Sequence, residues 1–204
     1  MNNRTLVVTL VSILGVLALA CTAGVVGVAW YLSHRSEAGP AAATDEAIPG
    51  LIDYRTTHPD WLQRTHVDPS VQVEYPMKPA AGGNHHPVWM RCLGDVYPSP
   101  VDEGSAVHSL EHGAVWVTYR PGLAPASIEA LAKRVRDHDY MFMSPYEGQS
   151  TAVSLQAWGY QLQLDSAKDA RIDAFIRKYR QTASMEAGVP CSNGTTSASP
   201  SSPS

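Results

Sequence analysis

The chain begins with a long hydrophobic stretch, Leu6 to Leu32, in which no residue is charged. A helix rises about 1.5 Å per residue, so a helix of this length extends roughly 40 Å. The hydrocarbon core of a bilayer is about 30 Å thick and takes about 20 apolar residues to cross. The pattern therefore predicts a single-pass transmembrane helix over residues 6–32, with a short cytoplasmic tail at residues 1–5.

Two other interpretations of this stretch are weaker. A cleaved signal peptide has an apolar region of only about 7–15 residues, which is much shorter than residues 6–32. A lipid attached at Cys21 is disfavoured because the apolar residues continue well beyond that cysteine. Positive charges on the two sides nearly balance, since Arg4 precedes the stretch and Arg35 follows it. We expect the short tail to stay inside the cell, which puts the C-terminal part of the chain outside the cytoplasm, on the cell membrane.

The rest of the chain divides into a spacer, one domain and a tail. Residues 33–50 are rich in small residues and include prolines and acids, which is typical of a linker. Residues 192–204 consist mainly of serine, threonine and proline, which bury little apolar surface and predict a disordered tail. Between them, residues 51–191 supply about 140 residues, enough for one compact extracytoplasmic domain.

Within that domain, strand and helix patterns alternate. Strand signals occur at residues 71–75, 114–119, 151–158 and 160–164. Helical spacing of apolar positions occurs twice, which predicts two main helices. These positions are Ile128, Leu131 and Val135 in one segment, and Ile172, Phe175, Ile176 and Tyr179 in the other. Short strands interleaved with two helices predict a small α+β domain with a mixed or antiparallel sheet.

Composition and charge narrow the range of partners. The chain is 44% hydrophobic and 17% charged, with a net charge of −4. Binding of nucleic acid favours a basic face, so we expect no nucleic-acid partner. The membrane, and a possible membrane-protein partner, are the partners that the predicted anchor indicates.

The cysteines agree with a location outside the cytoplasm. Cys21 falls within the predicted membrane helix, so Cys92 and Cys191 remain for the domain. An oxidising compartment allows such a pair to persist as a disulfide. We expect a Cys92–Cys191 disulfide; the alternative is two free thiols.

Histidines are the best candidates for chemistry. His108, Glu111 and His112 match the H-x-x-E-H pattern of inverted zinc peptidases. That mechanism needs the pattern on a long helix, with both histidines on one metal and the glutamate acting on a bound water. Because Gly104 and Gly113 flank the pattern, we expect barely one helical turn here. A metal-dependent hydrolase is therefore the weakest of the functional hypotheses, and a role without catalysis is favoured.

A metal site does not depend on the peptidase interpretation. One helical turn still places His108 and His112 on the same side, and the loop after Gly83 can deliver His85 or His86 as a third ligand. Imidazole ligands suit zinc and copper.

Two further points concern the neighbours of this site. A thioether from Met141 or Met143 would favour copper. We expect His58, His66 and His138 to lie on the surface. The alternative to a metal site is structural: Glu111 and the histidines would hydrogen-bond the loop backbone and hold the turn before the strand.

Five segments together resemble one known family. The resemblance covers roughly residues 76–191 and identifies the family catalogued as domain of unknown function 3105. The segments are Val107 to Pro121, Met143 to Gly148, Gln156 to Gly159, Leu164 to Asp169 and Gly188 to Cys191.

This resemblance implies an extracytoplasmic domain behind one membrane anchor, of a kind common in actinobacteria. It also implies that His85, rather than His86, belongs with His108, Glu111 and His112. It supplies no activity.

The first hypothesis is therefore a membrane-anchored accessory protein that binds copper or zinc through His85, His108 and His112. Glu111 would orient these ligands or act as a fourth one. The alternative is a structural or interaction domain of the cell envelope, or of a membrane complex, that binds no metal.

Overall fold

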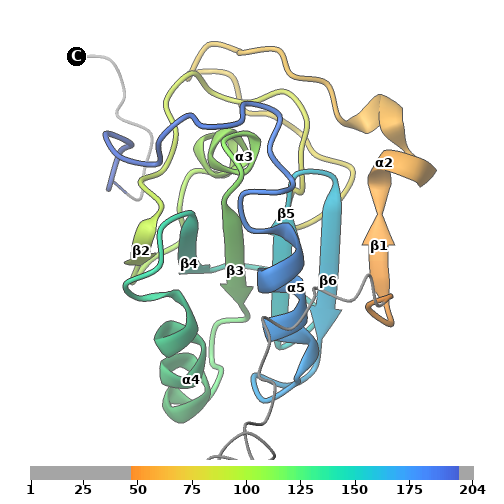
Figure 1. The fold of residues 1–204 in the computed structure, drawn as a ribbon. Helices are drawn as coiled ribbons and strands as arrows, with labels where there is room; N and C mark the ends of the chain where they lie inside the picture. Colours follow the sequence, from red (N-terminus) through yellow and green to blue (C-terminus); the bar gives the residue numbers. More distant parts are fainter. Residues whose placement is uncertain (1–46, 198–204) are drawn as a thin grey trace, which may run out of the picture. The chain divides into compact units, whose positions relative to one another are not determined.

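The computed structural model describes residues 47–197 (Figure 1). The predicted transmembrane segment, residues 6–32, lies outside this range. Within residues 47–197, no helix has the length and apolar content that crossing a membrane requires. In chain order, the elements are β1 (Leu51–Asp53), α2 (Tyr54–Thr57), the 3-10 helix η1 (Pro59–Trp61), β2 (Leu93–Val96), α3 (Glu103–Glu111), β3 (Val115–Tyr119), α4 (Pro125–Val135), β4 (Met141–Pro145), β5 (Val153–Ala157), β6 (Tyr160–Leu164) and α5 (Arg171–Tyr179).

The strands form one six-stranded sheet in the order β1-β6-β5-β3-β4-β2. Pairing is antiparallel from β1 to β3 and parallel from β3 through β4 to β2, so the sheet is mixed. The parallel pair β3 and β4 is joined through α4, as a crossover connection requires. β5 and β6 form a hairpin in which Gly159 takes a φ of 79°, a conformation that glycine adopts readily.

The two faces of the sheet bury two different apolar clusters. Side chains alternate along a strand, so Val115 and Val117 of β3 face one side while Trp116 faces the other. The two valines pack with α4 and α5, which Figure 1 shows beside one another along the sheet. Trp116 packs with Phe142 of β4 and with residues of α3. Every residue of β3 is therefore buried.

The sequence predictions for this domain are largely confirmed. The mixed α+β class is confirmed, and β3, β5, β6, α4 and α5 coincide with predicted segments. The strand predicted at residues 71–75 is wrong, because this segment makes no ladder and Val71 is 49% exposed. The helix around His108 is also longer than expected: α3 spans nine residues and includes Gly104.

A final segment, residues 184–197, crosses back over α3, as Figure 1 shows in dark blue. Its start is held by Glu111 O, which accepts a hydrogen bond from Met185 N–H at 2.9 Å. Its middle is held by a disulfide between Cys92 and Cys191, whose Cα atoms lie 5.1 Å apart. Past the disulfide, Thr195 still bridges to Met90. This segment therefore covers the end of α3 that carries the histidines.

Candidate metal centre

Helix α3 positions three of the predicted residues. Asp102 caps its N-terminus by accepting a hydrogen bond from a backbone N–H of the first turn at 2.7 Å. Gly113, with a φ of 103°, turns the chain away after the C-terminus. His108 lies three residues before Glu111 and four before His112, and such spacings put side chains on neighbouring positions of a helix.

The loop before α3 adds two more histidines. Gly82 and Gly83 take φ angles of 145° and 121°, which favour glycine. The backbone of His85 then makes two hydrogen bonds with the backbone of residues 65–67, at 3.1 and 2.8 Å. This short parallel bridge places His66 beside His85.

Four side chains converge where these segments meet α3. They are His66, His85, His108 and Glu111, which we call the first donor group. One possible ligand atom from each lies within 4.8 Å of those of the other three. The ring centroids of the three histidines lie 4.8 Å apart in every pair. His66 is exposed, and the other three side chains are buried.

Backbone carbonyls fix two of the imidazole rings. His85 Nδ1 lies 2.8 Å from Gly83 O, and His108 Nδ1 lies 2.7 Å from His86 O. A carbonyl oxygen only accepts hydrogen bonds, so each Nδ1 carries the hydrogen. In the neutral ring, the lone pair then belongs to Nε2. Histidines that bind metals are commonly oriented in this way.

The contact between His85 and Glu111 favours a cation at this point. His85 Nε2 lies 2.9 Å from Glu111 Oε2. This nitrogen is nevertheless buried without an aligned hydrogen bond. A lone pair and a carboxylate this close repel each other unless a cation lies between or beside them. A proton on Nε2 satisfies this need, and so does a metal ion.

The electrostatics of the group suit a metal. The pKa of His108 is lowered to about 4, chiefly by burial; the hydrogen bond to His86 O acts against this shift, and the neighbouring histidines add to it. Burial raises the pKa of Glu111, but the contact with His85 and the nearby His108 and Arg64 together hold this pKa below its usual value. The guanidinium of Arg64, 3.7 Å from Glu111 Oε1, acts in the same direction. At neutral pH, His108 is therefore neutral and Glu111 ionised, which are the states that metal ligation requires.

His112 belongs to a different set of side chains. Possible ligand atoms of His108, His112 and Glu186 lie within 4.8 Å of one another, and we call this set the second donor group. His112 Nε2 lies 3.5 Å from Glu186 Oε2, and burial lowers the pKa of His112. The predicted set of His85, His108, Glu111 and His112 is thus divided between two groups that share His108. The peptidase pattern needs Glu111 and His112 at one metal ion, but the structure puts them in different groups.

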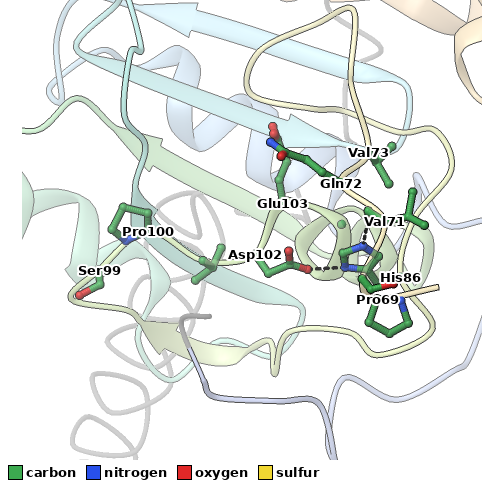
Figure 2. A pocket seen from close by; sticks show the side chains of 12 residues that line it. Pro69, Val71, Gln72, Val73, His86, Ser99, Pro100, Asp102 and Glu103 are labelled. Atoms are coloured by element: carbon green, nitrogen blue, oxygen red, sulfur yellow. Dashed lines mark hydrogen bonds and ion pairs between the residues drawn. The ribbon is translucent and has the colours of Figure 1, made fainter. Parts of the chain in front are cut away.

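His86 is occupied elsewhere. Its Nδ1 lies 2.7 Å from Asp102 Oδ2, and its Nε2 lies 3.0 Å from Val71 O, as Figure 2 shows. Both ring nitrogens therefore face oxygen acceptors, which leaves neither lone pair for a metal. The ring forms part of the wall of a hollow of about 720 Å³ that is also lined by Asp102 and Val71. Of the two adjacent histidines, His85 is the one in the donor group.

Met143, the predicted thioether ligand, packs in the apolar cluster of α4 and α5. Its strand neighbour Phe142 packs in the cluster of α3 instead. Because side chains alternate along a strand, Met143 lies on the face of the sheet opposite α3. Met141 packs in the same cluster, so neither of the two predicted thioethers lies with the histidines of α3.

Sequence reasoning missed two members of these groups. His66 was expected on the surface, and it is exposed, but its ring lies against those of His85 and His108. Glu186 lies in a segment without helical or strand pattern, and it is placed by a hydrogen bond from its N–H to Glu111 O at 3.2 Å. No local signal in the sequence indicates either residue, because both are positioned by contacts with distant segments.

Comparison with known proteins gives one match. The family model described as "Protein of unknown function (DUF3105)" matches residues 66–193. No curated protein and no solved structure matches the chain. The matched range includes every member of both donor groups and both cysteines of the disulfide.

Proposed function

The chain belongs to the DUF3105 family, and we propose that it binds one divalent transition metal, zinc in the first instance, through the first donor group. The observation that carries this proposal is the convergence of two buried imidazoles on a buried carboxylate. Both rings are held through Nδ1 by backbone carbonyls, so Nε2 is the free ligand atom in each.

The donor set favours zinc over copper(I). Three imidazoles and one carboxylate supply nitrogen and oxygen atoms, and zinc takes four such ligands in a tetrahedral arrangement. Copper(I) prefers sulfur, and Met143 packs on the opposite face of the sheet. Copper(II) binds nitrogen and oxygen ligands at least as strongly as zinc. Copper(II) is therefore the metal to compete against zinc in an experiment.

The number of protein ligands in the first donor group supports a role without catalysis. A catalytic zinc site has three protein ligands and keeps a position for water, whereas a site with four protein ligands is closed. The first donor group offers four. We therefore propose a metal-binding accessory protein rather than a hydrolase.

The proposed location is outside the cytoplasm, with residues 6–32 as the membrane anchor. The disulfide between Cys92 and Cys191 supports this part of the proposal, because such bonds persist in oxidising compartments. A protein held there would bind metal at the surface of the cell membrane, alone or beside a membrane-protein partner.

The experiment uses the full chain, stripped with a chelator and then titrated separately with zinc and with copper(II). We expect wild-type protein to hold one zinc per chain by mass spectrometry. The variant His108→Ala should lose at least about tenfold in affinity, since even the partners that orient metal ligands are worth 10–100-fold. His138→Ala is the matched control, because His138 is an exposed histidine outside both groups.

Two results would contradict this function. One is wild-type protein that retains no zinc after loading. The other is a His108→Ala variant that binds zinc as tightly as wild type and differs only in thermal stability. The second result would favour the structural alternative, in which the histidines only hydrogen-bond the loop backbone.

A further inference from the structure

The two donor groups overlap at a single side chain, His108. The first group joins it to His66, His85 and Glu111, and the second joins it to His112 and Glu186. The ring centroid of His108 lies 4.8 Å from that of His85 and 4.7 Å from that of His112. The His108 ring is therefore about equally close to His85 of the first group and His112 of the second.

His108 has only one nitrogen to offer. Its Nδ1–H is committed to His86 O at 2.7 Å, so a metal can bind only at Nε2. One imidazole nitrogen binds one metal ion at a time. The two groups therefore cannot both include His108 when both are filled.

From this overlap, and resting on the proposed function, we infer that the protein holds one metal ion in two alternative positions, with His108 as the ligand common to both. In the first position the ion is bound by the first donor group. In the second it is bound by His108, His112 and Glu186, which leaves a coordination site for water or for an incoming ligand.

The surroundings of the two positions support movement of an ion between them. Each group has buried members and one member that solvent reaches: His66 is exposed, and the Glu186 side chain is 40% exposed. Trp89 packs against both His108 and His112, with ring centroids 5.4 and 4.8 Å away. An ion at either position is thus bound by one ligand that solvent reaches. At the second position, the Trp89 ring covers one side of the ion.

The backbone keeps the two positions adjacent. Glu111 O accepts hydrogen bonds from Met185 N–H at 2.9 Å and from Glu186 N–H at 3.2 Å. Glu111, which supplies the carboxylate of the first position, thus holds the backbone of Glu186, which supplies the carboxylate of the second.

The test uses Co²⁺, a visible-light probe that takes the same nitrogen and oxygen ligands as zinc, with the full chain. Two single variants, His66→Ala and Glu186→Gln, each remove the solvent-reached ligand of one position, and the double variant removes both. These two side chains are the most exposed of each group, so their replacement should disturb the fold less than that of a buried ligand. The pair His138→Ala and Glu147→Gln is the matched control at exposed positions outside both groups.

We expect wild type to bind one Co²⁺ per chain. When the two positions hold similar shares of the ion, each single variant loses only about twofold in affinity, because the other position remains. The double variant should lose at least about tenfold, far more than the two single losses combined. The absorption spectra of the two single variants should differ, and the wild-type spectrum should be a weighted sum of them.

Three results would overturn the inference. Two Co²⁺ per chain would mean two independent sites. A Glu186→Gln variant with unchanged affinity and spectrum would mean that only the first position exists. Wild-type protein that binds no Co²⁺ and no zinc would instead remove the proposed function on which the inference rests.

Discussion

The disulfide between Cys92 and Cys191 joins residues 99 positions apart in the chain. Replacing both cysteines by serine removes this cross-link and raises the conformational entropy of the unfolded chain. In the chain-entropy account, a closed loop of about 100 residues is worth roughly 4.7 kcal/mol, and measured values are commonly about 2–4 kcal/mol. We expect the free energy of unfolding to fall by about 2–4 kcal/mol.

The folded state should survive this change because other contacts hold the same segments. Thr195 O accepts a hydrogen bond from Arg91 N–H at 2.9 Å, and Thr195 N–H donates to Trp89 O at 2.8 Å. On the other side of the disulfide, Met185 N–H donates to Glu111 O at 2.9 Å. The loss should therefore act mainly through the unfolded state, and zinc stoichiometry should be unchanged.

Urea unfolding followed by circular dichroism measures this loss, with far-UV spectra as a check on the folded state. Each kcal/mol lowers the melting temperature of a domain of about 150 residues by roughly 2–4 °C, so thermal melts provide a second reading. Cys21→Ser is the matched control, since Cys21 is the third cysteine of the chain and takes no part in this disulfide. A loss below about 1 kcal/mol, or loss of zinc by a folded double variant, would refute the reasoning.

Three further predictions concern α3 and its histidines. Zinc at 100 times its dissociation constant should stabilise wild type by about 2.7 kcal/mol. At the same zinc concentration, a melt of His108→Ala should show at most about half of this gain, because its binding is at least about tenfold weaker. Metal-free protein should lose stability as pH falls from 6.5 towards 4. The pKa of folded His108 is lowered to about 4, chiefly by burial, so the unfolded chain takes up the proton first. Urea unfolding at pH 7 and pH 5 tests this, and equal free energies of unfolding at the two pH values would contradict it. Gly104→Ala should cost about 1–3 kcal/mol, because its Cβ would lie 2.6 Å from His86 Nδ1. In a His86→Ala background that cost should vanish, as a double-mutant cycle would measure.

Local patterns explain which parts of this protein can be predicted from its sequence. The apolar run of β3, the hairpin of β5 and β6, and the helical spacing in α4 and α5 each depend on neighbours within a few residues. The histidines of α3 and of the glycine loop are also recognisable locally, although only the family resemblance implied that His85, rather than His86, joins His108, Glu111 and His112.

Other features depend on pairing between distant segments, and local patterns misjudge them. Residues 71–75 alternate as a strand does, but they find no partner strand, and Val71 O accepts a hydrogen bond from His86 instead. Gly104 suggested a short helix, yet it lies in the first turn of α3. The glycine is there for space rather than to end the helix, because a Cβ at this position would collide with the His86 ring. The face on which Met143 lies depends on the register of β4 in the sheet.

The sequence by itself determined the α+β class, the central strand and helices, and the residue types at the centre of the site. The tertiary structure alone decided how those residues divide. It brought His66 to His85 through a backbone bridge and Glu186 to Glu111 through the returning C-terminal segment, and it left His108 common to both groups. The physical reason is that ligand geometry is set by contacts between segments remote in sequence, which no local periodicity encodes.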